Sequence, residues 1–225
     1  MNIVFLCSGG GGNLKFLEFA VRRGWIGDAR ISAVIGDREC GGLFFARENG
    51  ISTYQHDFSL DRQGDLANFL KRFSPNVIVT NVHRILSSKF VEEFSGRLIN
   101  LHYSLLPSFS GLIGVRPIRE ALAYGVKFVG VTAHYVDEGV DTGRPIVQAA
   151  IPVFEEDGED ELMDVVFRCG CVSLVTAFRE VLRVPMGGIA RPVLNVKGRN
   201  VIFNPPVNEK DEFSDEVFWM RLKAL

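Results

Sequence analysis

The sequence lacks any apolar run long enough to cross a membrane. Its start, MNIVFLCSGGGGN, has no basic leader and too short an apolar segment for a signal peptide. Its few cysteines, Cys7, Cys40, Cys169 and Cys171, form no pair of CxxC motifs of the zinc-binding kind. We therefore expect a cytoplasmic protein with buried, reduced thiols and no metal.

A strong charge of either sign is also absent. The formal net charge is −2, which gives no general electrostatic case for nucleic acid or an anionic membrane as a partner. Internal repeats and low-complexity segments are absent too. The 225 residues, 47% hydrophobic and 23% charged, suit one full globular core, or one domain with an appendage.

Short apolar runs rich in β-branched residues alternate with helical patterns along the first 183 residues. This order predicts an α/β fold, Rossmann-like, with a mostly parallel sheet and helices on both faces. The predicted strands are 2–7, 29–37, 76–81, 97–101, 128–136 and 144–153. The predicted helices are 13–24, 42–50, 61–73, 115–125 and 159–182.

The character of the chain changes after Arg183. A turn-rich VPMGG segment precedes RPVLNVKGRNVIFN (191–204), which reads as a β-hairpin, and a short amphipathic tail follows. We predict a catalytic domain over residues 1–183 and a small appendage over 184–225. The exposed edge of the hairpin could pair between subunits and form a homodimer.

Four consecutive glycines lie between the first strand and the first helix, in CSGGGGNL (7–14). Glycines permit tight turns there, and a helix N-terminus presents backbone N–H groups to an anion. The loop matches neither the Walker pattern nor GxGxxG. We interpret it as a phosphate or carboxylate site, although a plain flexible turn would have the same composition.

Asn100 and His102 stand two residues apart at the end of an apolar strand, in NLHYSLLPSFSGL (100–112). Alternate strand residues share a face, so the amide and the imidazole project together. Such a pair is either structural or catalytic. Its location favours catalysis, because ligands of parallel sheets bind beyond the carboxyl ends of the strands.

An acidic, glycine-containing loop follows in HYVDEGVDTGRPI (134–146). It is either a solvated turn or the source of a carboxylate that orients an imidazole. The other histidines, His56, His83 and His134, are interpreted as structural or carry no signal.

Together, SGGGGNL, HRILS (83–87), NLHYSLLPSFSG and DEGVDTG resemble the formyltransferases that use 10-formyltetrahydrofolate, and most nearly the phosphoribosylglycinamide type. The resemblance covers residues 1 to about 183. It implies that Asn100, His102 and Asp141 are catalytic. The amide and an imidazolium would stabilise the oxyanion formed when an amine attacks the formyl carbon. Asp141 would hold and charge His102 and assist removal of the amine proton.

The resemblance also implies binding residues. Gly10, Gly11, Gly12, Asn13 and Tyr103 would bind a small, phosphate-bearing amine acceptor. The residues that would bind the folate donor are Arg84, Ile85, Leu86, Val91, Val136, Asp137, Glu138, Gly139 and Val140.

The acceptor side departs from the family's pattern. Gly12 stands where a serine is usual, Ile113-Gly114-Val115 replaces a His-Thr-His segment, and Gly170-Cys171 aligns with a Glu-His pair. These departures leave an amino-sugar nucleotide open as the acceptor. A formyltetrahydrofolate hydrolase is a third alternative; such enzymes carry a regulatory domain ahead of the catalytic one, for which no residues precede Met1, so we expect transfer rather than hydrolysis. A non-catalytic folate- or nucleotide-binding relative is not expected, because Asn100, His102 and Asp141 occur together.

Overall fold

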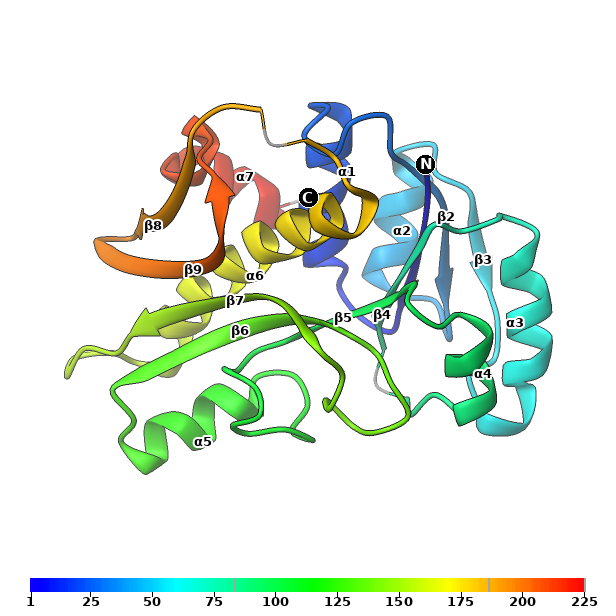
Figure 1. Cartoon of the computed structure of the whole chain (residues 1–225), viewed down its shortest axis with the longest axis horizontal. Coiled ribbons are helices and arrows are strands. Elements are labelled where there is room, and N and C mark those ends of the chain that lie inside the picture. The colour runs from blue at the N-terminus through cyan, green and yellow to red at the C-terminus, as the bar shows by residue number, and fades with distance from the viewer. Residues whose placement is uncertain (83, 186, 225) are drawn as a thin grey trace. The chain divides into compact units, whose positions relative to one another are not determined.

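The computed structural model of the chain describes residues 1–82, 84–185 and 187–224. The chain forms two compact units. The first comprises Met1–Asn100 and Tyr135–Gly143, and the second comprises Leu101–His134 and Arg144–Ala224. Figure 1 labels their helices and strands.

Strands and helices alternate in the first unit, as the sequence predicts. Its strands are parallel and lie in the order β3-β2-β1-β4-β5. The elements are β1 (Asn2–Cys7), α1 (Gly12–Arg22), β2 (Arg30–Gly36), α2 (Gly41–Glu48), β3 (Thr53–Gln55), η1 (Leu60–Arg62), α3 (Gln63–Lys71), β4 (Val77–Asn81), α4 (Ser88–Glu93) and β5 (Leu98–His102). The chain passes from the first unit to the second within β5, after Asn100.

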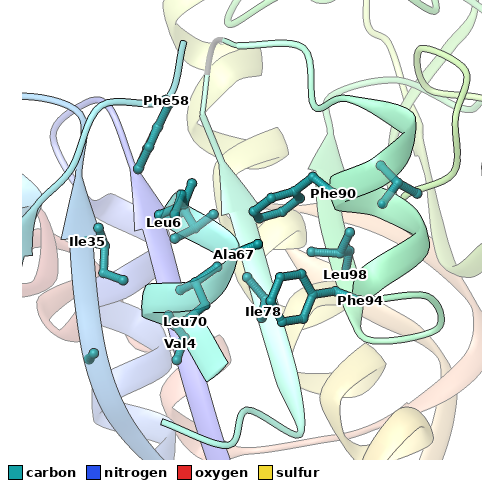
Figure 2. Packing of buried hydrophobic residues seen from close by; sticks show 13 residues of the cluster. Val4, Leu6, Ile35, Phe58, Ala67, Leu70, Ile78, Phe90, Phe94 and Leu98 are labelled. Atoms are coloured by element: carbon teal, nitrogen blue, oxygen red, sulfur yellow. The ribbon is translucent and has the colours of Figure 1, made fainter. Parts of the chain in front are cut away.

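The parallel strands are buried on both faces, which explains their almost unbroken apolar sequences. Side chains alternate across the pleat, so Val4 and Leu6 of β1 face the side that α3 and α4 cover. Figure 2 shows Ala67 and Leu70 of α3 and Phe90 of α4 packed in this cluster. Helices α1 and α2 contact each other and β2.

The second unit contains antiparallel strands, in the order β6-β7-β9-β8. Helix α6 packs mainly against β7, β9 and β8. The first turn of α6 carries three acidic side chains, whose charge suits the positive end of the helix dipole. The elements are α5 (Arg116–Tyr124), β6 (Phe128–Tyr135), β7 (Pro145–Pro152), α6 (Glu159–Leu182), β8 (Ala190–Val196), β9 (Arg199–Asn208), η2 (Asp211–Phe213) and α7 (Glu216–Ala224).

The predicted α/β fold with a C-terminal hairpin is confirmed. The sequence pattern missed β3 and α4, which have three and six residues and are too short for a periodic signal. It also did not indicate that the strands of the second unit run antiparallel. Among the described residues, no helix combines the length and apolarity that a membrane crossing needs.

Candidate active site

The glycine-rich segment links β1 to α1 in the first unit. Gly10 lies in the loop, Gly11 is the N-cap of α1, and Gly12 and Asn13 form the start of the helix. Gly11 has φ +76°, a left-handed conformation that favours glycine, and it provides no side-chain cap. Four of the predicted acceptor residues, Gly10 to Asn13, thus lie at a helix N-terminus, which is suited to an anion.

Close backbone packing fixes this loop against α2. A Cβ added to Gly11 would lie 2.7 Å from the Cα of Gly42, and the amide of Gly42 donates to the carbonyl of Gly9 at 3.1 Å. Beneath them, the Cys7 and Cys40 sulfurs are 3.6 Å apart. Burial raises the pKa of the Cys7 thiol, and Cys40 raises it further. The Cys7 thiol therefore packs as a neutral group.

Several predicted folate-binding residues are brought together in the first unit. Val91 belongs to the buried cluster of Figure 2, and Leu86 and Val136 pack against the same cluster. Arg84 is exposed, and the side chain of Ile85 is 67% exposed. The apolar residues Ile85 and Leu86 thus stand side by side in sequence, one exposed and one packed on the buried cluster.

The acidic loop that follows β6 is shaped by one of its own carboxylates. The amide of Val136 donates to the carbonyl of Leu98 at 3.0 Å, which attaches the loop to β5. Asp137 accepts hydrogen bonds from the amide of Gly139 at 3.1 Å and from the hydroxyl of Thr142 at 2.7 Å. Asp137, one of the predicted folate contacts, thus has a structural task within the loop.

The backbone of Asp141 is in an uncommon conformation. Its φ is +56°, and Asp141 is half-buried whereas Glu138, Gly139 and Val140 are exposed. A residue other than glycine with a positive φ has a strained backbone. Proteins often retain such strain at functional positions. This conformation makes Asp141 a stronger candidate for chemistry than the other acidic residues of the loop.

His102 ends β5 and is buried. Its Nε2 is 3.1 Å from the carbonyl oxygen of Phe109. Because a carbonyl can only accept, Nε2 is the donor in this hydrogen bond. Asn100 lies on the same strand and is half-buried.

The loop after His102 is held by side chains of β6 and β7. Thr132 donates to the carbonyl of Ser104 at 2.8 Å and accepts from the amide of Leu106 at 3.1 Å. Gln148 donates to the carbonyl of Leu106 at 3.0 Å. These bonds fix the loop that presents the Phe109 carbonyl to the histidine, so they hold the imidazole indirectly.

Gly170 of α6 lies against the end of β5, against Tyr103 just after that strand, and against β6. A Cβ there would be 3.0 Å from Leu101, 3.2 Å from Tyr103 and 3.5 Å from Val131. A larger side chain at this position would displace Tyr103, a predicted acceptor-binding residue. Cys171 is fully buried, and burial raises the pKa of its thiol well above the usual value.

Sequence reasoning missed the polar residues that shape these loops: Gln63, Thr132 and Gln148. Each lies within a helix or strand whose hydrophobic pattern indicates a role in core packing and no other role. The buried position of Gln63 at the start of α3 becomes evident only from its contacts. His83 lies outside the described residues. Within 1–82, 84–185 and 187–224, no group of three or more His, Cys, Asp or Glu side chains is arranged to hold a metal ion.

Comparisons with known proteins show which family the chain resembles. The model of the formyl transferase family matches residues 1–177. The phosphoribosylglycinamide formyltransferase of Escherichia coli (strain K12) is 36% identical over 169 residues, which cover 72% of this chain and 78% of that protein. The crystal structure of glycinamide ribonucleotide transformylase 1 from Symbiobacterium toebii has a TM-score of 0.75 and 30% identity, over 90% of this chain and 93% of that one.

A formyltetrahydrofolate deformylase from Pseudomonas syringae is also similar in fold. Its TM-score is 0.69 with 22% identity, over 89% of this chain and 65% of that one. This likeness concerns the fold alone. The match over residues 1–177 and the similarity to the E. coli enzyme show that the chain belongs to the formyl transferase family.

Proposed function

We propose that this formyltransferase moves the formyl group of 10-formyltetrahydrofolate to the primary amine of a small, phosphate-bearing acceptor. The names of the relatives from E. coli and S. toebii make phosphoribosylglycinamide the first acceptor to consider. Binding of the folate donor is supported by one observation: Leu86, Val91 and Val136 are grouped at one apolar cluster. An apolar wall of this kind suits the flat ring of a folate.

Three polar residues divide the chemistry in this proposal. The amide of Asn100 and the protonated imidazole of His102 stabilise the negative charge on the oxygen of the tetrahedral intermediate. The carboxylate of Asp141 takes the proton that the attacking amine releases, directly or through water. As the intermediate collapses, the bond between the formyl carbon and N10 of the folate breaks, and the proton held by Asp141 passes to N10, directly or through water. The amine keeps the formyl group as a formamide, without a covalent enzyme intermediate.

The glycine-rich segment would hold the acceptor's phosphate. Gly10, Gly11, Gly12 and Asn13 surround the start of α1, where the helix dipole favours a negative charge. Glycine at position 10 has open space around its Cβ position, so a ligand can approach the backbone there. Tyr103 completes the proposed acceptor set.

An amino-sugar nucleotide is the second candidate acceptor. The observation that favours it is the packing at Gly170, where Leu101 and Tyr103 fill the space of a larger side chain. A pocket that lacks a carboxylate at this position cannot bind the hydroxyl groups of the acceptor in the family's usual way. Hydrolysis of the donor is the third candidate, and water alone is included among the acceptors to test it.

The test is an absorbance assay of deformylation with 10-formyl-5,8-dideazafolate as donor. The acceptors are phosphoribosylglycinamide, dTDP- and UDP-linked amino sugars, and water alone. The proposal expects turnover with an amine and slow release with water. Turnover with water alone would show that the protein is a hydrolase and not a transferase. No turnover with any acceptor would contradict the proposal.

The matched variants are His102→Ala and His56→Ala. Loss of His102 should lower kcat by roughly 10²- to 10³-fold, the usual contribution of one donor that stabilises an oxyanion. His56 binds the carbonyl of Asp57 and has no proposed role, so its variant should keep wild-type kcat. Equal activity of the two variants would remove His102 from the mechanism.

We further propose the domain boundary predicted from the sequence, with the catalytic domain over 1–183 and the appendage over 184–225. The family match ends at residue 177, which supports it. The appendage is packed onto α6 and β7 rather than free: β9 pairs with β7, and Glu216 of α7 binds Arg168 of α6.

A further inference from the structure

Gln63 is a polar side chain in an apolar part of the first unit. It begins α3 and is only 1% exposed. Its Nε2 donates to the carbonyls of Phe58 at 3.1 Å and Ile85 at 3.0 Å. Its Oε1 accepts from the amide of Ser87 at 2.7 Å. A single buried amide therefore satisfies three backbone groups from two separate segments.

These bonds act on the segment that joins β4 to α4. Ile85 and Ser87 lie just before α4, whose N-cap is Ser87. Gln63 binds the backbone on both sides of Leu86, while the side chain of Ile85 remains 67% exposed. An apolar side chain would normally turn inward, so a backbone held in this way keeps Ile85 directed outward.

On its other side, Gln63 is bonded to a residue of the buried core. Phe58, whose carbonyl is the third partner of Gln63, is 1% exposed and belongs to the cluster of Figure 2. Gln63 therefore connects the loop before α4, in which Arg84 and Ile85 are exposed, to the core of the unit. Rigid support of this kind is what a binding loop needs to be ready for its ligand.

We propose that Gln63 is a positioning residue, which holds the backbone of Ile85–Ser87 in the conformation that binds the formyl donor. This inference rests on the proposed function, because the donor is the ligand assigned to Arg84–Leu86. Gln63 does not touch the donor; it acts through the loop.

Glutamine is specifically suited to this position. The site needs two donors and one acceptor on a planar group, and an amide supplies all three. Glutamate would direct a carboxylate oxygen at two carbonyls in a buried place, which is repulsive. Methionine keeps the length and volume but supplies none of the strong hydrogen bonds, so it removes the clamp with little change of shape.

The test compares Gln63→Met with Ala67→Gly. Ala67→Gly weakens the same helix without affecting any hydrogen bond of the loop. Hydrogen exchange should show the amide of Ser87 exchanging at least tenfold faster in Gln63→Met, relative to the amides of β1 in the same protein. In Ala67→Gly the ratio between Ser87 and β1 should remain that of the wild type. An unchanged ratio in Gln63→Met would overturn the clamp.

Donor binding tests the consequence for function. The Kd of 10-formyl-5,8-dideazafolate, measured by calorimetry, and its KM should rise at least tenfold in Gln63→Met. The KM of the acceptor should stay within twofold, and Ala67→Gly should match the wild type in both. Equal donor affinity in Gln63→Met and wild type would overturn the positioning role.

The calorimetric experiment separates the two proposals. A wild-type protein that does not bind the folate analogue would contradict the proposed function and, with it, this role of Gln63. A wild type that binds the analogue, beside a Gln63→Met variant that binds equally well, would contradict the role of Gln63 alone.

Discussion

Both units contain buried neutral side chains that hydrogen-bond the backbone, but the second unit also buries a charged pair. In the first, neutral groups satisfy the backbone: Gln63 bridges three groups, and Thr80 donates to the carbonyl of Ile99. In the second, charges are buried in pairs: the side chains of Arg199 and Asp157 are 4% and 1% exposed. The first unit should therefore respond mainly to changes of shape, and the second to changes of charge.

The buried pair in the second unit connects the hairpin to the loop before α6. Arg199, at the start of β9, hydrogen-bonds Asp157 through both terminal nitrogens and lies over the ring of Phe154, 4.3 Å from its centroid. Arg191 on the neighbouring strand makes an ordinary surface pair with Glu209, with both side chains about half exposed. The two arginines allow a direct comparison within one hairpin.

The largest effect is expected from Arg199→Met. It leaves the Asp157 carboxylate buried without its partner, which should lower the free energy of unfolding by about 3–5 kcal/mol. Arg191→Met should lower it by about 1 kcal/mol or less. Urea unfolding measures both. Losses that agree within 1 kcal/mol would contradict the contrast between buried and exposed charge.

The first unit should be sensitive to shape instead. Gly11→Ala adds a Cβ that would lie 2.7 Å from the Cα of Gly42, at a residue with φ +76°. Overpacking of this kind costs roughly 1–3 kcal/mol. Gly10→Ala meets nothing within 4 Å and has no positive φ, so it is the matched control. Thermal unfolding should separate the two variants, and equal midpoints would show that the glycine loop is not tightly packed against α2.

The sequence contains most of the first unit's architecture in readable form. NIVFLC and NVIVTN are apolar because both faces of the parallel sheet are covered, and this produces a strong signal. The candidate residues Asn100, His102 and Asp141 were found through motif and resemblance. Gln63 could not be identified from the sequence, because its proposed role depends on hydrogen bonds to both Phe58 and Ile85. These two residues are distant from each other in the sequence, and only folding brings them together. The charges around Asp164 were hidden for the same reason.

Asp164 of α6 is the centre of the second unit's other charge cluster. Arg168, Lys197 and Lys223 all donate to its carboxylate, and Arg168 also binds Glu216. Burial by itself raises the pKa of Asp164, but the hydrogen bonds from the three cations hold it well below its usual range. The cluster joins α6 to the hairpin and to α7.

The smallest effect is expected from Lys223→Met. The lysine is about half exposed, and two other cations remain on Asp164, so the loss at pH 7 should be about 1 kcal/mol or less. The loss should shrink further in 1 M salt, which screens an exposed charge. The same change at Lys71, whose pair with Glu93 lies in the first unit, is the control for a surface lysine.

Low pH should remove the difference in stability between wild type and Lys223→Met. A carboxylate with a lowered pKa in the folded state adds stability above its unfolded pKa of about 4, and this contribution is lost as the pH falls through the folded value. Wild type and Lys223→Met should therefore keep the same difference in stability from pH 7 to below pH 4, and converge only as the pH falls through the folded pKa of Asp164, since a protonated Asp164 no longer attracts the lysine. A difference that is the same in low salt and in 1 M salt would mean that Lys223 acts through its aliphatic chain, and that the charges around Asp164 do not set the stability of α7 on α6.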